Sequence, residues 1–243
     1  MTAPILRADS MGRRFGDRAV LTAATLFAYP GRITLVMGRN GCGKSTLLKL
    51  IVGRLRADYG SVHFNQHVYL RPRLHELARK GLFYIPERGL LSRYMTLQQN
   101  LSVSGVALSE PPAQRLLAQL ALGKLLNSYG AQLSGGERRL SDIALAMLKR
   151  PLCLLADEPF QGMAPIDGER IAHALRTLRD QGTAIVVTGH EVNLLFDVAD
   201  EVVWMTGGTT HLLGSVTQAR DNHQFNREYL AGTGRLPLSG RPP

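Results

Sequence analysis

Hydrophobic positions along the first third of the chain follow a strand period and then a helical one. Residues 5–9 and 19–28 carry short apolar alternations, which predict strands, and residues 33–37 predict a buried strand. Residues 45–53 are apolar on a helical period and end in Gly53, which is typical of a helix with a glycine cap.

The rest of the chain alternates between the two patterns. Short strands are predicted at 62–64 and 82–85. Beyond residue 133 we expect helices over 135–150, 167–181 and 191–199, and strands over 152–156, 184–188 and 201–205. Strands that alternate with helices indicate a mainly parallel sheet covered on both faces.

The segment 88–133 differs from its surroundings. Residues 96–104 and 112–122 have a helical pattern, and a Ser-Glu-Pro-Pro run at 109–112 separates them. We expect a small helical insertion within one domain that spans residues 1–235. The Pro/Gly-rich residues 236–243 are predicted to be a disordered tail.

Length and composition favour a single globular domain. The 243 residues are 44% hydrophobic, which is enough for one full core. No stretch approaches the roughly 20 apolar residues that span a bilayer, and the N-terminus does not read as a secretion signal. We therefore expect the protein to stay on the cytoplasmic side. Two cysteines do not make a disulfide framework.

The formal net charge of +10 admits three interpretations. A solvated basic surface is the first, attraction to an anionic membrane leaflet the second, and nucleic-acid binding the third. Nucleic acid is the least favoured partner, because the basic residues are scattered and no aromatic residues interleave with them as a stacking platform requires.

A glycine-rich loop follows the buried strand at 33–37 and precedes the helix. It fits the pattern G-x-x-x-x-G-K-S with the residues Gly38, Arg39, Asn40, Gly41, Cys42, Gly43, Lys44 and Ser45. Such a loop points its backbone N–H groups at phosphate oxygens. Lys44 is predicted to reach the outer phosphates of ATP and Ser45 to ligate Mg²⁺, and Thr46 belongs to the same phosphate-binding set.

Two carboxylates follow the predicted strand 152–156. A strand that ends in Asp157 and Glu158 places both at the carboxyl edge of the sheet, where α/β proteins bind ligands. Asp157 suits the water shell of Mg²⁺, and Glu158 suits orientation and deprotonation of the attacking water. Alone, such a pair is more often a solvated turn. In a chain that also has a phosphate loop, it is a strong indication of a nucleotide site.

The string Leu133–Glu137 (Leu-Ser-Gly-Gly-Glu) stands at the start of the predicted helix 135–150. Ser134, Gly135 and Gly136 offer a hydroxyl, backbone N–H groups and a helix dipole to an anion. Lys44 already serves the phosphates in its own subunit. This second anion-binding helix N-terminus is therefore suited to contact a nucleotide that a partner subunit holds.

With these motifs in this order, the chain resembles the ATP-binding cassette (ABC) family from about residue 5 to residue 232. Phe15 matches the aromatic residue that stacks on adenine, and His190 matches the switch histidine that contacts the γ-phosphate. The resemblance implies a P-loop fold of ABC type: a mainly parallel sheet, an antiparallel β subdomain and a small helical insertion.

The resemblance also implies a working assembly. Two cassettes pair head to tail, as a homodimer or a heterodimer, and each MgATP lies between the phosphate loop of one and the signature Leu133–Glu137 of the other. A separate membrane permease subunit would hold the cassette at the cytoplasmic face of the plasma (inner) membrane. Residues 71–80, the insertion and the loop at Glu87 would form the docking face.

Two other functions compete with a transporter ATPase. Soluble cassettes that act on nucleic acid or ribosomes usually carry two cassettes or a long coiled coil, which this chain lacks, and the signature argues against a P-loop kinase. Within the family, the residues around Glu87 and residues 157–160 are similar to those of the group that contains branched-chain amino acid importer and lipopolysaccharide-export ATPases. One kind of ATPase drives import and the other export, so the sequence determines neither the transported substrate nor the direction of transport.

Three residues depart from the family pattern. Glu87 stands where most cassettes carry Gln, and its carboxylate is expected to hold Mg²⁺ or its water. Ala164 stands where Asp is common, which affects contact between the two active sites. Cys42 lies at a helix N-terminus, where a thiol is expected to have a lowered pKa, so thiol reagents are predicted to inhibit the enzyme and ATP to protect it.

Overall fold

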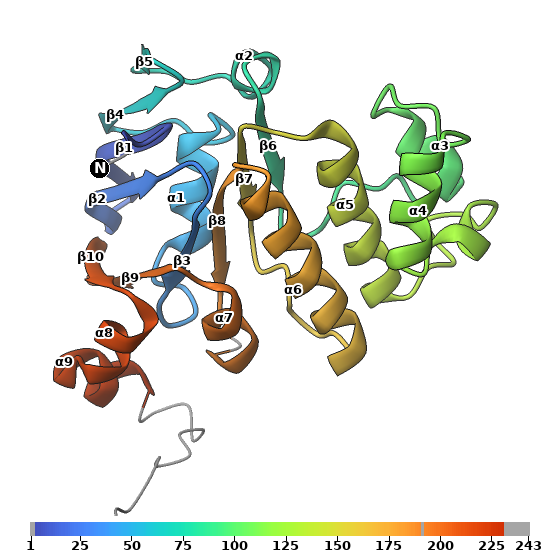
Figure 1. Cartoon of the computed structure of the whole chain (residues 1–243). Coiled ribbons are helices and arrows are strands. Elements are labelled where there is room, and N and C mark those ends of the chain that lie inside the picture. The colour runs from blue at the N-terminus through green and yellow to red at the C-terminus, as the bar shows by residue number, and fades with distance from the viewer. Residues whose placement is uncertain (1–2, 191, 231–243) are drawn as a thin grey trace, which may run out of the picture.

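One ten-stranded sheet runs through the computed structural model, which describes residues 3–190 and 192–230 (Figure 1). Its order is β5-β4-β1-β2-β10-β9-β3-β8-β7-β6. The first part pairs antiparallel and consists of β1 (Leu6–Phe15), β2 (Arg18–Ala28), β4 (Tyr59–Phe64) and β5 (His67–Tyr69). Short turns at 16–17 and 65–66 join β1 to β2 and β4 to β5, whereas β4 pairs with β1 only after the chain has passed through β3 and α1.

The second part of the sheet is mainly parallel. Its parallel strands are β3 (Ile33–Met37), β6 (Leu82–Ile85), β7 (Cys153–Ala156), β8 (Ala184–Gly189) and β9 (Glu201–Thr206). β10 (Thr209–Gly214) pairs antiparallel with β9 and touches β2 in parallel. These parallel strands are almost wholly buried, as expected when helices cover both faces.

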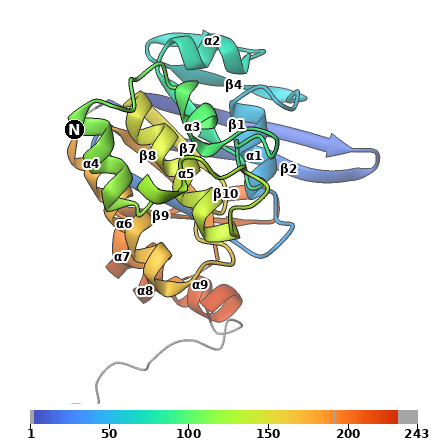
Figure 2. The same ribbon diagram turned by 90° about the vertical axis from the view of Figure 1, so that its right-hand side faces the viewer.

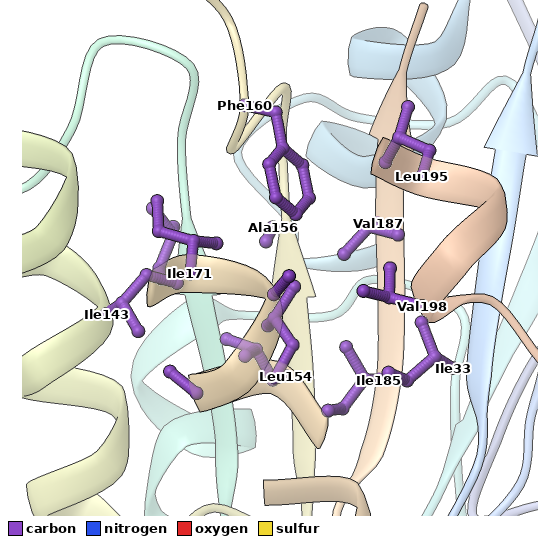
Figure 3. Close-up of a cluster of buried hydrophobic side chains, with 14 of the residues drawn as sticks. Ile33, Ile143, Leu154, Ala156, Phe160, Ile171, Ile185, Val187, Leu195 and Val198 are labelled. Carbon is purple, nitrogen blue, oxygen red and sulfur yellow. The ribbon is translucent and has the colours of Figure 1, made fainter. Parts of the chain in front are cut away.

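Helices cover the two faces of the parallel part and give the sheet two cores. α1 (Lys44–Ile51) packs on one face, where Val36, Leu155 and Val186 point. α5 (Gly135–Lys149), α6 (Pro165–Asp180) and α7 (Val192–Val198) lie on the other, where Leu154, Ile185 and Val187 meet Ile143 and Ile171 (Figure 3). The period of two along each strand sends neighbouring side chains to opposite cores.

The insertion contains α3 (Leu97–Ser102), α4 (Pro111–Gln119) and a 3₁₀ turn (Gly123–Leu125), and it stands at the right-hand side of Figure 1, the side that faces the viewer in Figure 2. Thr96 and Gln99 form a capping box that starts α3. Leu97, Leu101 and Leu117 join the same core as α5. α5 therefore links the insertion to the sheet.

The fold class predicted from the sequence is confirmed: the sheet is mixed, mainly parallel in its covered part, and carries helices on both faces. The elements α2 (Leu74–Arg79), β5, β10, α8 (Val216–Asp221), α9 (His223–Phe225) and the π turn at 226–230 were not predicted. They are short, and β10, which is as long as β8, has no buried residue and so no apolar pattern that marks a strand. The domain bounds stay a prediction, and the predicted tail 236–243 lies outside the described residues.

Within residues 3–190 and 192–230, no helix combines the length and apolar character needed to cross a bilayer.

Candidate nucleotide site

The predicted phosphate loop, carboxylates and switch histidine converge because three neighbouring parallel strands end at one edge of the sheet. The strand order β3-β8-β7 puts Met37, Gly189 and Ala156 at adjacent carboxyl ends. The residues that follow each strand therefore share one crevice, as in other open α/β sheets.

The loop 38–43 turns sharply into α1. Gly43 caps the helix with φ 114°, a conformation that favours glycine, and a Cβ there would lie 2.7 Å from Leu21. Lys44 is 5% exposed, and its Nζ donates to the carbonyl oxygen of Gly38 over 2.8 Å. The loop thus holds its own lysine beside the N-terminus of α1, where anions are stabilised.

Asp157 is fully buried below the loop. Its Oδ1 accepts hydrogen bonds from the hydroxyls of Ser45 at 3.0 Å and Thr188 at 2.7 Å. Its Oδ2 is buried with no hydrogen-bond partner among the described residues. An unpartnered carboxylate oxygen beside a serine hydroxyl is a donor set that suits Mg²⁺, a hard cation that binds through oxygen and water.

Glu158 occupies a left-handed backbone conformation (φ 51°) that is rare for glutamate. Its N–H donates to Thr188 Oγ1 over 3.0 Å, which holds the turn. Its Oε1 lies 3.6 Å from Lys44 Nζ, and its Oε2 lies 3.0 Å from His190 Nδ1. The carboxylate is therefore held between a cation and an imidazole, in a position to act on a group in the crevice.

These side chains surround a cavity of about 280 Å³. Its lining comprises Asn40, Gly41, Gly43, Lys44, Ser45, Thr46, Glu87, Glu158, Gln161 and His190. Glu87 thus lies with the phosphate loop, as the sequence suggested. Gln161 and the supporting Thr188 were missed, since neither belongs to a motif; their positions just after β7 and within β8 were the available signal.

The signature and Phe15 do not join this cavity in the single chain. Ser134 and Gly135 are exposed at the start of α5, where Ser134 Oγ accepts from Glu137 N at 3.2 Å and Glu137 Oε2 accepts from Ser134 N at 2.7 Å. Gly136 packs so closely on Asp167 that a Cβ would lie 2.5 Å from its carboxylate. Phe15 is 44% exposed, with the Arg13 guanidinium 4.8 Å from its ring centre.

The expectation that the Cys42 thiol has a lowered pKa is wrong. Burial raises the pKa of the Cys42 thiol, against a smaller opposing effect of the Lys44 charge. The thiol lies against Gly38, and the loss of solvation outweighs the field of the helix N-terminus. Ala164 is the N-cap of α6 and offers the helix no side-chain cap, unlike the Asp expected there.

Arg139 is a buried residue next to the site that the sequence motifs did not reveal. This buried guanidinium donates to the carbonyl oxygens of Pro86 at 3.1 Å, Glu87 at 2.6 Å and Glu158 at 3.4 Å. It also lies 3.6 Å from Asp142, whose pKa burial raises to about 6 although the Leu90 N–H and Arg139 oppose the shift. A single side chain thus ties the signature helix to the Glu87 loop and to the turn at Glu158. A charged residue on the apolar face of a predicted helix was the signal.

The strand–loop–helix cradle, the paired carboxylates and the histidine define a P-loop nucleoside triphosphatase. The profile of the family described as "ABC transporter" matches residues 21–161. The chain belongs to the ABC transporter family and is one of its ATP-hydrolysing cassettes.

Among curated relatives, the lipopolysaccharide export system ATP-binding protein LptB of Haemophilus influenzae is 30% identical over 93% of this chain and 97% of its own length. The protein of the same name from Escherichia coli K12 is 30% identical over 95% and 99%. A probable ABC transporter ATP-binding protein of Azorhizobium caulinodans is 29% identical over 95% and 84%.

Solved structures agree on the fold. An ATP-binding cassette of an ABC transporter in its ADP conformation aligns with a TM-score of 0.80 at 24% identity, over 96% of this chain and all of the other. A dimeric cassette in a post-hydrolysis state bound to ADP and Pi aligns with a TM-score of 0.74 at 22% identity, over 86% and 98%.

Replacing Arg139 by Lys is expected to lower kcat by about tenfold to a hundredfold and to change the KM for ATP little, because one ammonium cannot span three carbonyls and the catalytic turn shifts. Steady-state ATPase assays measure both parameters. Arg138→Lys, one residue away and outside this network, is the matched control. A rise in KM with unchanged kcat would show that Arg139 acts on binding instead.

Cys42 is expected to react slowly with a disulfide reagent at neutral pH and faster as the pH rises past the usual thiol range, because its raised pKa leaves little thiolate. The rate of reagent cleavage against pH measures this. Cys42→Ser retains only Cys153, which is fully buried, and supplies the background. A fast rate that levels off near neutral pH would contradict a raised pKa and show that the Cys42 pKa is lowered.

Proposed function

We propose that the chain supplies half of each of two MgATP sites in a pair of cassettes that drives a separate membrane permease. One observation carries this proposal. Within the described residues, the phosphate loop, Asp157, Glu158 and His190 line or support one cavity, whereas the signature helix start faces solvent elsewhere. A site with its signature on another surface is incomplete until a second cassette supplies one.

The phosphate loop and Asp157 would hold MgATP. Backbone N–H groups of residues 38–43 and the start of α1 suit the phosphates, and Lys44 would leave Gly38 and Glu158 for the outer phosphate oxygens. Ser45 and Asp157 would hold Mg²⁺, with Glu87 near enough to the cavity to hold one of its waters. The metal neutralises charge on the phosphates when bound.

Glu158 and His190 would carry out the chemistry at the γ-phosphate. Glu158 would orient water and accept its proton, since its carboxylate faces the cavity and its turn is fixed by Thr188. The His190 ring, hydrogen-bonded to the same carboxylate, would contact the γ-phosphate and keep the Glu158 carboxylate oriented toward the attacking water. Phe15, exposed at the end of β1, remains our candidate for the adenine stack.

The second cassette is either another copy of this chain or a related one. Ser134, Gly135 and Gly136 at the start of α5 would bind the γ-phosphate held by the partner's loop. The permease would dock on residues 71–80, the insertion and the loop at Glu87, placing the cassette at the cytoplasmic face of the inner membrane. Because the relatives named LptB belong to lipopolysaccharide export, an amphiphilic lipid is the first cargo class to test.

Replacement of Glu158 by Gln is expected to lower kcat by about a hundredfold or more, because the amide cannot accept the proton of water. ATP binding should persist, and ATP should stabilise a dimer that size-exclusion chromatography detects. Wild-type turnover in this variant would remove Glu158 from its role. Glu169→Gln, on the outer face of α6, controls for the loss of a carboxylate.

Complementation between two inactive variants tests whether the signature works in trans. Lys44→Ala disables the loop, and Ser134→Asp keeps the helix cap but sets a negative charge against phosphate. A mixed homodimer has one site with both defects and one with neither, so mixing should restore up to about half of the activity per mixed dimer.

The neutral cap Ser134→Asn separates charge from capping in the same assay and should retain more activity than Ser134→Asp. If ATP induces dimers of both variants and the mixture stays inactive, both halves of the site must come from one chain. Absence of any self-dimer would instead point to a related cassette as the natural partner.

A further inference from the structure

The edge of the molecule opposite to the nucleotide site is rich in cations. It consists of segments 53–56, 67–81 and 149–152, which we call the basic edge. It contains eight lysine and arginine residues: Arg54, Arg56, Arg71, Arg73, Arg79, Lys80, Lys149 and Arg150. Glu76 is the one acidic residue in these described segments, so a large part of the +10 formal charge gathers here.

Direct contacts make the basic edge continuous. Gly53 lies against the carbonyl of Pro72, and Lys80 Nζ is 2.9 Å from His67 Nε2. Leu152 N donates to the carbonyl oxygen of Gly81 over 2.8 Å. Figure 1 shows β5, α2 and the loop between α5 and β7 at one end of the molecule, the amino end of the parallel strands.

These cations are available to an outside partner. All of them except the half-buried Lys80 are exposed, and the Arg73 side chain is 70% exposed. Among the described residues, the only ion pair of this group joins Arg73 to Glu76 at 3.7 Å. Several unpaired cations within one Debye length add their attraction for an anionic surface.

Exposed apolar side chains stand between the cations. Leu70 is 75% exposed, Val68 62% and Leu152 46%. Alternation of arginine with protruding aliphatic residues suits the boundary of a bilayer, where phosphates meet acyl chains. A nucleic acid would call for stacking rings, but Tyr69, the one Phe, Tyr or Trp residue in these segments, is half-buried.

We propose that the basic edge binds the anionic phospholipid surface of a membrane, with its guanidinium groups on headgroup phosphates and Leu70 and Val68 at the headgroup boundary. The contact is separate from the nucleotide site, and residues 71–80 belong both to the basic edge and to the proposed permease docking face, so the two contacts would be adjacent. The lipid contact would hold each cassette against the leaflet beside the membrane protein and would weaken steeply with salt.

The test is sedimentation of the full chain with vesicles of phosphatidylglycerol and phosphatidylcholine, compared with pure phosphatidylcholine, at low and high salt. We expect binding to the anionic vesicles only, lost at high salt. Arg54→Glu with Arg56→Glu, two exposed cations of the basic edge outside the proposed docking face, should weaken it at least about tenfold. Leu70→Ser should weaken it further at a fixed lipid charge. ATPase activity of these variants should stay at the wild-type level, which shows that they fold.

The matched control is Arg115→Glu with Lys124→Glu, two exposed cations of the insertion that change the net charge equally. Equal loss in this control would mean that total charge, not the basic edge, governs binding. Equal binding to neutral vesicles, or retention by the Arg54/Arg56 variant, would overturn the proposal. Displacement of bound vesicles by a stoichiometric RNA oligonucleotide would overturn it in favour of nucleic acid.

Discussion

The carboxylate of Asp157 is the point on which the site depends. One of its oxygens accepts from Ser45 in the first turn of α1 and from Thr188 near the end of β8, while the residue itself directly follows β7. Two hydrogen bonds to one buried carboxyl group thus tie three elements together. A buried carboxylate with one unpartnered oxygen is costly, and the proposed Mg²⁺ would offset that cost. Metal binding would then be linked to order in the crevice.

Arg139 extends this arrangement to the insertion. Its guanidinium satisfies carbonyls of the Glu87 loop and the Glu158 turn, and it stands on the same helix whose first residues form the signature. α5 also packs on α3 and α4. A displacement of the insertion by a docked partner would therefore reach the catalytic turn through one rigid helix rather than through a flexible loop.

Sequence patterns predicted the parallel strands and long helices well, because a buried strand and an amphipathic helix each have a characteristic pattern of hydrophobic positions. They also predicted which residues would meet at the crevice, since the carboxyl ends of β3, β7 and β8 must share an edge once the strands are neighbours. They could not give the hydrogen bonds of Arg139 or Thr188, which depend on tertiary distances. The pKa of Cys42 was misjudged for the same reason: burial, which no local motif reports, outweighs the helix N-terminus.

The capping box at the start of α5 has a consequence for the timing of a catalytic cycle. In the single chain, Ser134 and Glu137 already satisfy each other's backbone groups. A phosphate that arrives from a partner must therefore share or replace a hydrogen bond that exists, so the net gain is smaller than the number of contacts suggests. In the proposed pair, the γ-phosphate charge would then contribute more to the contact at the start of α5 than new hydrogen bonds do. Release of that charge would therefore weaken the contact between the two cassettes.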